Sequence, residues 1–213
     1  MADEHVISRR EFIKVTSFIG SGFAIGFNSL VGSKHQASNF SPDTFVNVLS
    51  DDTIILSVSK AEMGQGVWTS LPMLIAEEME ASWDKVKVNQ TSKDSFMGTG
   101  GSMSIKDYGW KKMRKSGAIA KYMLIEAAAL KWKVSPLECD AKNSVVVHRK
   151  SGKKSSYGSL VEEASKIKIP KKVKLKHNSN FTLLGKDMLR TDSKIKVDGS
   201  APFAMDINLE GML

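Results

Sequence analysis

Two short glycine-containing loops carry the residues whose types and spacing could do chemistry. The first is Gly64-Gln65-Gly66, and the second is Thr99-Gly100-Gly101-Ser102-Met103-Ser104. Glycine lets a backbone approach a ligand without a Cβ, and a following helix N-terminus adds free N–H groups and a favourable dipole end. Gln65 can donate and accept at once, and Ser102 and Ser104 add hydroxyls. Together the loops predict a site for an anionic ligand rich in hydrogen-bond acceptors.

Several other kinds of site are excluded or left open by the same residues. A glycine beside a helix start is also compatible with a simple turn, so either loop alone leaves that alternative open. Neither loop contains the G-x-G-x-x-G or G-x-x-x-x-G-K-[ST] pattern of a dinucleotide or P-loop site. The single cysteine, Cys139, excludes a four-thiolate zinc or iron–sulfur site, and the four histidines lack metal-ligand spacing. We therefore expect no metal ligand in this chain.

Hydrophobic periodicity indicates the elements that must position the two loops. It predicts strands over residues 45–49, 53–58, 85–90 and 144–148, and helices over residues 69–81, 107–132 and 156–166. Gly117 and several alanines in the long helix would let another element approach closely, and Ser104 and Asp107 supply capping groups. The expected fold class is α+β, without regular βαβ units.

The helix expected over residues 69–81 directly follows the first loop. Its inward face is formed by residues at three- and four-residue spacing: Trp68, Leu71, Ile75 and Met79. Glu77 and Glu80 would then face away. Thr69 is the expected N-cap, which places Pro72 in the first turn, where its missing N–H is not needed.

An excess of positive charge is concentrated late in the chain. Lys and Arg number 31 against 23 Asp and Glu, a formal net charge of +8. We expect the segment KKVKLK, residues 171–176, to be a half-exposed edge strand protected by its lysines. Nucleic-acid surfaces interleave aromatic with basic residues, and here only Tyr157 and Phe181 lie near. A solvated basic face is therefore expected, with no nucleic-acid partner.

The amino terminus has the layout of an export signal. The heptapeptide Ser8-Arg9-Arg10-Glu11-Phe12-Ile13-Lys14 precedes an uncharged stretch over residues 15–33 and resembles the twin-arginine pattern. That stretch is too rich in glycine and serine for a confident membrane span. We expect residues 1–37 to be a signal peptide and the protein to be periplasmic or exported after folding in the cytoplasm. An amphipathic start to a soluble helix is the alternative, and contact with a membrane is expected only through the signal.

A family resemblance is carried by several motifs in order. The segments AEMGQGVWTSLPMLIAEEMEASWDKVKV and GTGGSMSIKDYGWKKMRKSGAIAKYML resemble the molybdenum-cofactor segment of the xanthine oxidase–aldehyde oxidase family, most closely its isoquinoline 1-oxidoreductase β-subunit type. SYGSL, LLGKDMLRTDSKIKVDGSAPFAMDI and EGML also match. The resemblance implies the cofactor-binding segment of a molybdenum hydroxylase large subunit, over residues 38–150. A basic connecting helix and strand region over 151–183 and the truncated start of an a/b hammerhead domain over 184–213 would follow.

The resemblance also assigns site residues and a cofactor. Gly64, Gln65 and Gly66 would contact molybdopterin, in its cytosine dinucleotide form. The second loop would lie along the pterin and phosphate through Thr99, Gly100, Gly101, Ser102 and Ser104. Met63 and Trp68 are expected in the core, as large apolar residues beside a turn usually are. Glu62 is expected to be a solvated or capping residue.

The activity implied by the resemblance is oxidation of N-heterocycles or aldehydes, with water as the oxygen source. Electrons would leave through a [2Fe–2S] partner subunit, because one cysteine cannot hold such clusters. The family's general-base glutamate lies beyond Leu213, so we expect no catalytic residue in this chain and no activity from it alone. The chain would be an N-terminal portion: a split-gene product, a truncated frame or a fragment, whose remainder is a possible separate partner. An exported non-catalytic basic binding protein, or an inactive remnant, is the alternative.

The export signal generates the first testable prediction. Replacing Arg9 and Arg10 together by lysine keeps the charge but removes the planar guanidinium groups that a receptor can read. Export should stop, and the precursor should accumulate in the cytoplasm, as measured by cell fractionation and immunoblotting. Normal arrival of the double-lysine variant in the periplasm would refute the twin-arginine interpretation.

Overall fold

A computed structural model describes residues 39–43, 45–91, 101 and 103–212. All described residues belong to one compact unit, Gln36–Leu213. The expected export signal, together with Thr99, Gly100 and Ser102, lies outside the described residues. Among the described helices, none combines the length and apolar character needed to cross a membrane.

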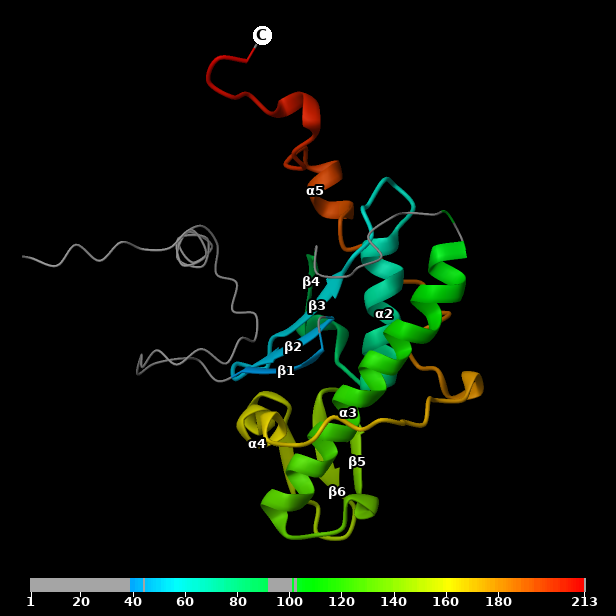
Figure 1. Ribbon diagram of the computed structural model, residues 1–213, viewed down its shortest axis with the longest axis vertical. Helices are drawn as coiled ribbons and strands as arrows, with labels where there is room; N and C mark the ends of the chain where they lie inside the picture. Colours follow the sequence, from blue (N-terminus) through cyan, green and yellow to red (C-terminus); the bar gives the residue numbers. More distant parts are fainter. Residues whose placement is uncertain (1–38, 44, 92–100, 102, 213) are drawn as a thin grey trace, which may run out of the picture. The chain divides into compact units, whose positions relative to one another are not determined.

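A four-stranded sheet carries the first glycine loop (Figure 1). Its strands, in spatial and chain order, are β1 (Asn39–Asp43), β2 (Val46–Leu49), β3 (Ile54–Val58) and β4 (Val86–Gln90). The first three run antiparallel, whereas β3 and β4 are parallel. A parallel pair needs a crossover, which is helix α2 (Val67–Met79) followed by the 3-10 turn η1 (Trp83–Lys85). The α+β class is confirmed, and β3–α2–β4 is a single βαβ unit within it.

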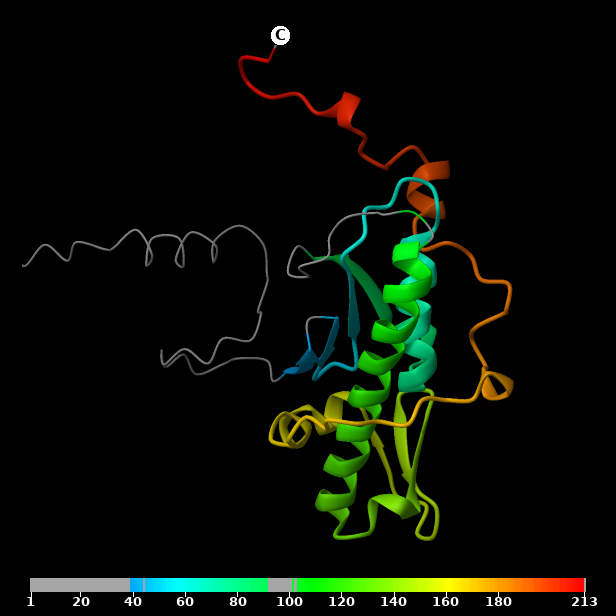
Figure 2. The ribbon, with the colours of Figure 1, turned by 45° about the vertical axis from the view of Figure 1, so that its right-hand side comes forward.

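Two long helices pack closely against each other beside this sheet (Figures 1 and 2). Helix α3 (Trp110–Trp132) follows a π-helical turn, η2 (Ser104–Gly109). A Cβ on Gly117 would lie 2.2 Å from the backbone oxygen of Ile75 on α2, so only glycine permits this approach. Val48, Ile54 and Leu56 are fully buried. The alternating burial of β2 and β3 turns one face of the sheet inward, as the sequence pattern predicts.

A second sheet packs near the carboxyl end of α3. Its strands are β5 (Cys139–Lys142), β6 (Val145–His148) and β7 (Lys154–Ser156), in that order and antiparallel. The turns η3 (Pro136–Glu138) and η4 (Gly158–Leu160) flank this sheet, and the short helix α4 (Val161–Ser165) follows. The hydroxyl of buried Tyr157 donates to the Met79 carbonyl at 2.5 Å. This bond ties the SYGSL segment to the end of α2.

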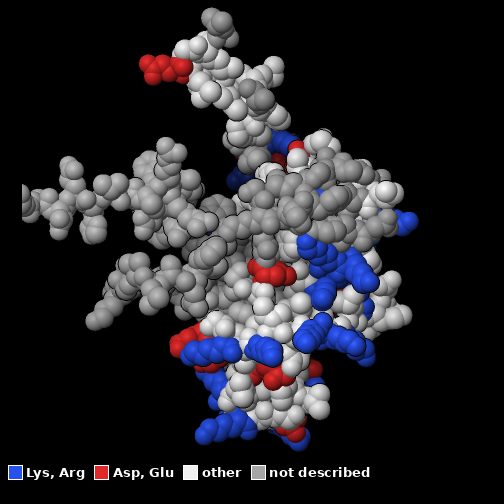
Figure 3. Space-filling view, viewed as in Figure 1, with Lys and Arg blue, Asp and Glu red and all other residues white. Residues whose placement is uncertain are grey.

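The lysine-rich segment after α4 is not an edge strand. Within the described residues, 171–176 pair with no strand, so that expectation is wrong. Residues 171–184, here called the strap, instead run beside α2 and α3 and include the turn η5 (Asn178–Asn180) (Figures 1 and 2). Lys171, Lys172 and Lys174 are exposed, as expected of a solvated face. On the face drawn in Figure 3, basic and acidic side chains are interspersed.

Glu77 and Glu78 hold the strap against α2. Glu77 is 1% exposed and accepts hydrogen bonds from the backbone N–H groups of Thr182, Leu183 and Leu184 at 3.0, 2.7 and 2.9 Å. It also pairs with the ammonium group of Lys176. The expectation that Glu77 faces solvent is therefore wrong, because irregular backbone packed on the helix needs a buried acceptor.

The neighbouring carboxylate, Glu78, completes the attachment of the strap. It accepts from Arg114 Nε at 2.7 Å and from the Lys176 backbone N–H at 2.9 Å. The Arg114 guanidinium lies 5.0 Å from the ring centroid of Trp110 and 5.1 Å from that of Phe181. Cation–π contacts and a buried ion pair thus join α2, α3 and the strap. Beyond the strap lie the helix α5 (Ser193–Val197) and the turn η6 (Ala204–Asp206).

The buried position of Glu77 predicts that the strap loosens in acid. Burial tends to raise the pKa of Glu77, but hydrogen bonds from Lys176 and from the strap N–H groups outweigh it and lower the pKa from 4.5 to about 2. The ionised form is favoured in the folded state, so its stabilisation is complete above about pH 5 and is lost as the pH falls towards 2. A shift of this size corresponds to about 3 kcal/mol. Glu77→Gln should remove most of this pH dependence.

The measurement is the free energy of unfolding between pH 2 and 7, together with amide exchange at Thr182, Leu183 and Leu184 in the wild-type chain. Glu162→Gln is the control, because the Glu162 carboxylate is exposed and forms an i,i+4 ion pair with Lys166. An acid-induced loss of stability that Glu77→Gln leaves unchanged would contradict the prediction.

Candidate functional site

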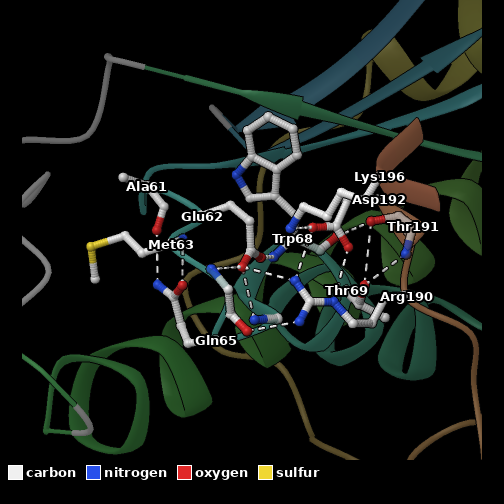
Figure 4. Close-up of polar contacts among 12 residues, drawn as sticks. Ala61, Glu62, Met63, Gln65, Trp68, Thr69, Arg190, Thr191, Asp192 and Lys196 are labelled. Atoms are coloured by element: carbon white, nitrogen blue, oxygen red, sulfur yellow. Dashed lines mark hydrogen bonds and ion pairs between the residues drawn. The ribbon is translucent and has the colours of Figure 1, made fainter. Parts of the chain in front are cut away.

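The first glycine loop is built around the carboxylate of Glu62 (Figure 4). Oε1 of Glu62 accepts from the backbone N–H groups of Gly64 and Gly66 at 2.8 and 2.9 Å, and Oε2 accepts from that of Trp68 at 3.1 Å. Gly64 and Gly66 have φ values of 100° and 80°, which L side chains rarely adopt. The side chain of Glu62 therefore caps helix α2 from a position before the loop.

This geometry corrects two expectations about the loop. The N–H groups of Gly64 and Gly66 are not free, because the Glu62 carboxylate already occupies the anion position at the helix N-terminus. Thr69 is not the N-cap, because the helix begins at Val67 after Gly66. Glu62 itself is a capping residue, one of the two expected roles. Burial raises its pKa, but hydrogen bonds from Gly66, Trp68 and Gly64 outweigh burial and lower that pKa overall.

Gln65 lies at the exposed tip of the loop, with its amide held at both ends. Its Oε1 accepts from the Met63 N–H at 2.5 Å, and its Nε2 donates to the Ala61 carbonyl at 2.8 Å. A primary amide has two donor hydrogens and two acceptor lone pairs, so among the described residues one of each has no partner and is available to a ligand. Met63 is 71% exposed, and its expected place in the core is wrong. Trp68 is partly buried and packs against the core, as expected.

The two glycines leave open space beside Gln65. Apart from the two adjacent residues in each case, no described residue has an atom within 4 Å of the position that a Cβ would take on Gly64 or Gly66. A flat heterocyclic ligand could therefore approach the backbone here and pair its edge with the Gln65 amide. The first loop fits the polar edge of a pterin, but the N–H groups of Gly64, Gly66 and Trp68 are already bound to Glu62 and are not available to a phosphate.

Of the second loop, the structure describes Gly101, Met103 and Ser104. Gly101 has φ 66°, and no described atom lies within 4 Å of its Cβ position. Ser104 begins the π-helical turn that leads into α3. Thr99, Gly100 and Ser102 lie outside the described residues. The expected pairing of the two loops around one ligand therefore stays a prediction.

A segment from the far end of the chain completes the first loop. Arg190 donates through Nη1 to the Gly64 carbonyl at 2.7 Å and through Nη2 to Glu62 Oε1 at 3.1 Å (Figure 4). Its Nε and Nη2 also donate to the two oxygens of Asp192, each at 2.9 Å. No sequence pattern assigned Arg190 a role. The one signal that could have found it was the RTD triplet inside the matching LLGKDMLRTDSKIKVD segment.

Thr191 supplies a hydrogen bond that proline removes from α2. Pro72 lies in the second turn of the helix, not the first, so the Trp68 carbonyl lacks its usual i+4 donor. The Thr191 hydroxyl donates to that carbonyl at 3.1 Å. The Thr191 N–H donates to the Thr69 hydroxyl at 2.9 Å. The 190–192 segment is thus hydrogen-bonded to both the loop and the first turns of the helix.

A double-mutant cycle tests whether the Thr191 hydroxyl replaces the N–H donor that Pro72 lacks. Thr191→Val should lower the free energy of unfolding by about 1 kcal/mol, because it leaves the Trp68 carbonyl without a donor. In a Pro72→Ala background the new N–H at residue 72 can donate to that carbonyl, so the same change should matter much less. Chemical denaturation of the four proteins measures the coupling.

Thr182→Val is the matched control for this cycle, because the Thr182 hydroxyl contacts Glu77 and not Trp68. Its effect should be the same with proline or alanine at position 72. Equal effects of Thr191→Val in both backgrounds would show that the two residues do not share the Trp68 carbonyl.

Several known proteins are similar to this chain over most of its length. The β subunit of isoquinoline 1-oxidoreductase from Brevundimonas diminuta is 28% identical over 97% of this chain. A membrane-bound aldehyde dehydrogenase [pyrroloquinoline-quinone] from Gluconacetobacter polyoxogenes is 33% identical over 97%. A nicotinate dehydrogenase subunit from Pseudomonas putida is 24% identical over 79%.

The share of each relative that is matched is smaller. The chain spans 32%, 28% and 14% of the lengths of these three relatives, respectively. The molybdopterin cofactor-binding domain family matches residues 4–206, which include the Gln65 loop, the second glycine loop and the 190–192 segment. By this match, the chain belongs to the molybdopterin cofactor-binding domain family.

Proposed function

We propose that this chain forms part of a molybdenum-cofactor oxidoreductase that hydroxylates N-heterocycles or aldehydes. The observation that carries the proposal is the Gln65 loop: an exposed amide, held in place by the backbone groups of Met63 and Ala61, beside two glycines with open surroundings. The family match and the oxidoreductase names of the relatives support it. When bound, the molybdenum centre would supply a two-electron oxidant and water-derived oxygen for the substrate.

The residues of this chain would bind and orient the cofactor. We propose that the free N–H and lone pair of Gln65 pair with a pterin edge. Gly64 and Gly66 would let the ring approach the backbone. Gly101, with Thr99, Gly100, Ser102 and Ser104, would lie along the pterin and the phosphates of a cytosine dinucleotide form. The phosphates belong to the second loop in this proposal, because the Glu62 carboxylate already accepts from the N–H groups of Gly64 and Gly66 in the first.

We propose that electrons leave through iron–sulfur clusters held outside this chain. Cys139 is the one cysteine of the chain, and it is buried, with burial as the main cause of its raised thiol pKa. A buried thiol with a raised pKa is poorly suited to ligate a metal as thiolate. We propose a [2Fe–2S] partner subunit that accepts the electrons. This proposal is consistent with two matched relatives being named as subunits.

We also propose that the protein is exported in folded form. The support is the heptapeptide containing Arg9 and Arg10 and the uncharged stretch that follows it. A route that carries folded proteins suits a protein whose cofactor is inserted before export. The Arg9→Lys, Arg10→Lys exchange tests this part independently of the cofactor.

The cofactor proposal is tested by the molybdenum and pterin content of protein purified from its natural host. Gln65→Ala should weaken retention roughly five- to 150-fold, because an unpaired buried polar atom costs about 1–3 kcal/mol. Gly101→Val should weaken it further, since a branched side chain is strained at φ 66° and blocks the backbone. Metal analysis and the fluorescence of the oxidised pterin measure both.

Two variants serve as controls. Gly152→Val introduces the same strain, at φ 69° and in equally open surroundings, but in the turn between β6 and β7. Lys172→Ala changes an exposed strap residue. Both should retain the cofactor. Equal molybdenum content in all variants, or wild-type protein carrying pyrroloquinoline quinone and no molybdenum, would refute the proposal.

A further inference from the structure

The backbone on both sides of Gln65 is held by hydrogen bonds to side chains outside the loop. On its amino side, the Gly64 carbonyl accepts from Arg190 Nη1 at 2.7 Å. On its carboxyl side, the Gly66 N–H donates to Glu62 Oε1 at 2.9 Å. Because glycine imposes few limits on its own φ and ψ, these bonds set the two peptide planes that aim the Gln65 side chain.

Arg190 contributes to both of these restraints. Its Nη2 donates to the same Oε1 of Glu62 that accepts from Gly64 and Gly66. Glu62 and Asp192 are nearly buried, with side chains 8% and 5% exposed, whereas the Arg190 side chain is 36% exposed. Removing the guanidinium would take away the cation that these two nearly buried carboxylates share.

A row of alternating charges holds the guanidinium in its plane. Asp192 binds Nε and Nη2 of Arg190, and Lys196 of α5 pairs with Asp192 on its other side. Thr191, which lies between Arg190 and Asp192 in the sequence, is hydrogen-bonded to Trp68 and Thr69 on α2. Figure 4 shows this arrangement around the loop. The guanidinium is therefore oriented before any ligand arrives.

We propose that Arg190 is a positioning residue that aims the Gln65 amide at the cofactor, so that seating of the 190–192 segment and cofactor binding strengthen each other. The inference rests on the proposed function, because it needs Gln65 to contact the pterin. Two events that favour the same loop conformation are coupled reciprocally. The segment of residues 190–192 would thus belong to the cofactor site despite its distance in sequence.

Arg190→Ala and Arg190→Lys together test the geometry. Lysine can still pair with Glu62, but its single ammonium cannot at once hold the Gly64 carbonyl and both oxygens of Asp192. In the full chain without cofactor, amide exchange at Gly64, Gly66 and Trp68 should become roughly tenfold faster in the alanine variant, and less so in the lysine variant.

Arg149→Ala is the matched control. Arg149 likewise binds both oxygens of an aspartate, Asp140, at 2.8 and 2.9 Å and a backbone carbonyl, that of Leu137, but it does so at the second sheet. Its loss should leave exchange in the Gln65 loop unchanged. Unchanged loop exchange in both Arg190 variants would overturn the inference.

The second measurement is cofactor retention in the assembled protein. Arg190→Ala should lower the molybdenum and pterin content roughly tenfold, and combining it with Gln65→Ala should add little, because the two residues act through one contact. Additive losses, or full retention despite faster loop exchange, would overturn the positioning role and leave the proposed function standing. Wild-type protein without molybdenum or pterin would instead overturn the proposed function, while the exchange experiment would still decide whether Arg190 holds the loop.

Discussion

Hydrogen bonds from irregular backbone to buried carboxylates are the interaction on which the rest of this structure depends. Glu62 collects three N–H groups at the start of α2, and Glu77 collects three from the strap near the end of the same helix. Backbone that belongs to no helix or sheet still needs partners when it is buried. Charged acceptors make such bonds stronger than neutral ones do.

Helix α2 is consequently the element to which distant segments attach. It is the crossover of the β3–α2–β4 unit, and Gly117 brings α3 against its backbone. The strap binds its carboxyl-terminal half through Glu77 and Glu78, and the 190–192 segment binds its first turns. Each of these contacts joins residues dozens of positions apart, so the shape of the loop depends on segments that follow it late in the chain.

The position of Glu62 changes what the first glycine loop can recognise. A glycine loop at a helix N-terminus ordinarily offers N–H groups to an anion. Here an internal carboxylate takes that place, and the exposed group is the neutral amide of Gln65. The loop is thereby suited to a heterocycle edge with donors and acceptors side by side. Anionic parts of a ligand would have to be bound elsewhere.

Much of the framework follows from the sequence alone. Strand and helix periods are local properties, so the sequence indicates the alternation in β2, β3 and β4 and the inward residues Leu71, Ile75 and Met79 of α2. It also indicates that another element approaches the long helix at Gly117. The loop Gly64-Gln65-Gly66 and the family were also recognisable. The lysine-rich strap was not, because alternating lysine and apolar residues fit an edge strand as well as an extended segment.

Only the tertiary structure decided the partners of the charged and polar residues. Helical period places Glu77 outward, but the strap covers that face and turns it into a buried acceptor. Pro72 lies one turn deeper in the helix than predicted and is tolerated because Thr191 supplies the missing donor. Arg190 reaches Gly64 across 126 residues, a separation at which no local pattern carries information. Periodicity reports which face of an element is apolar, whereas the partner of a buried polar group is set by whichever segment packs against it.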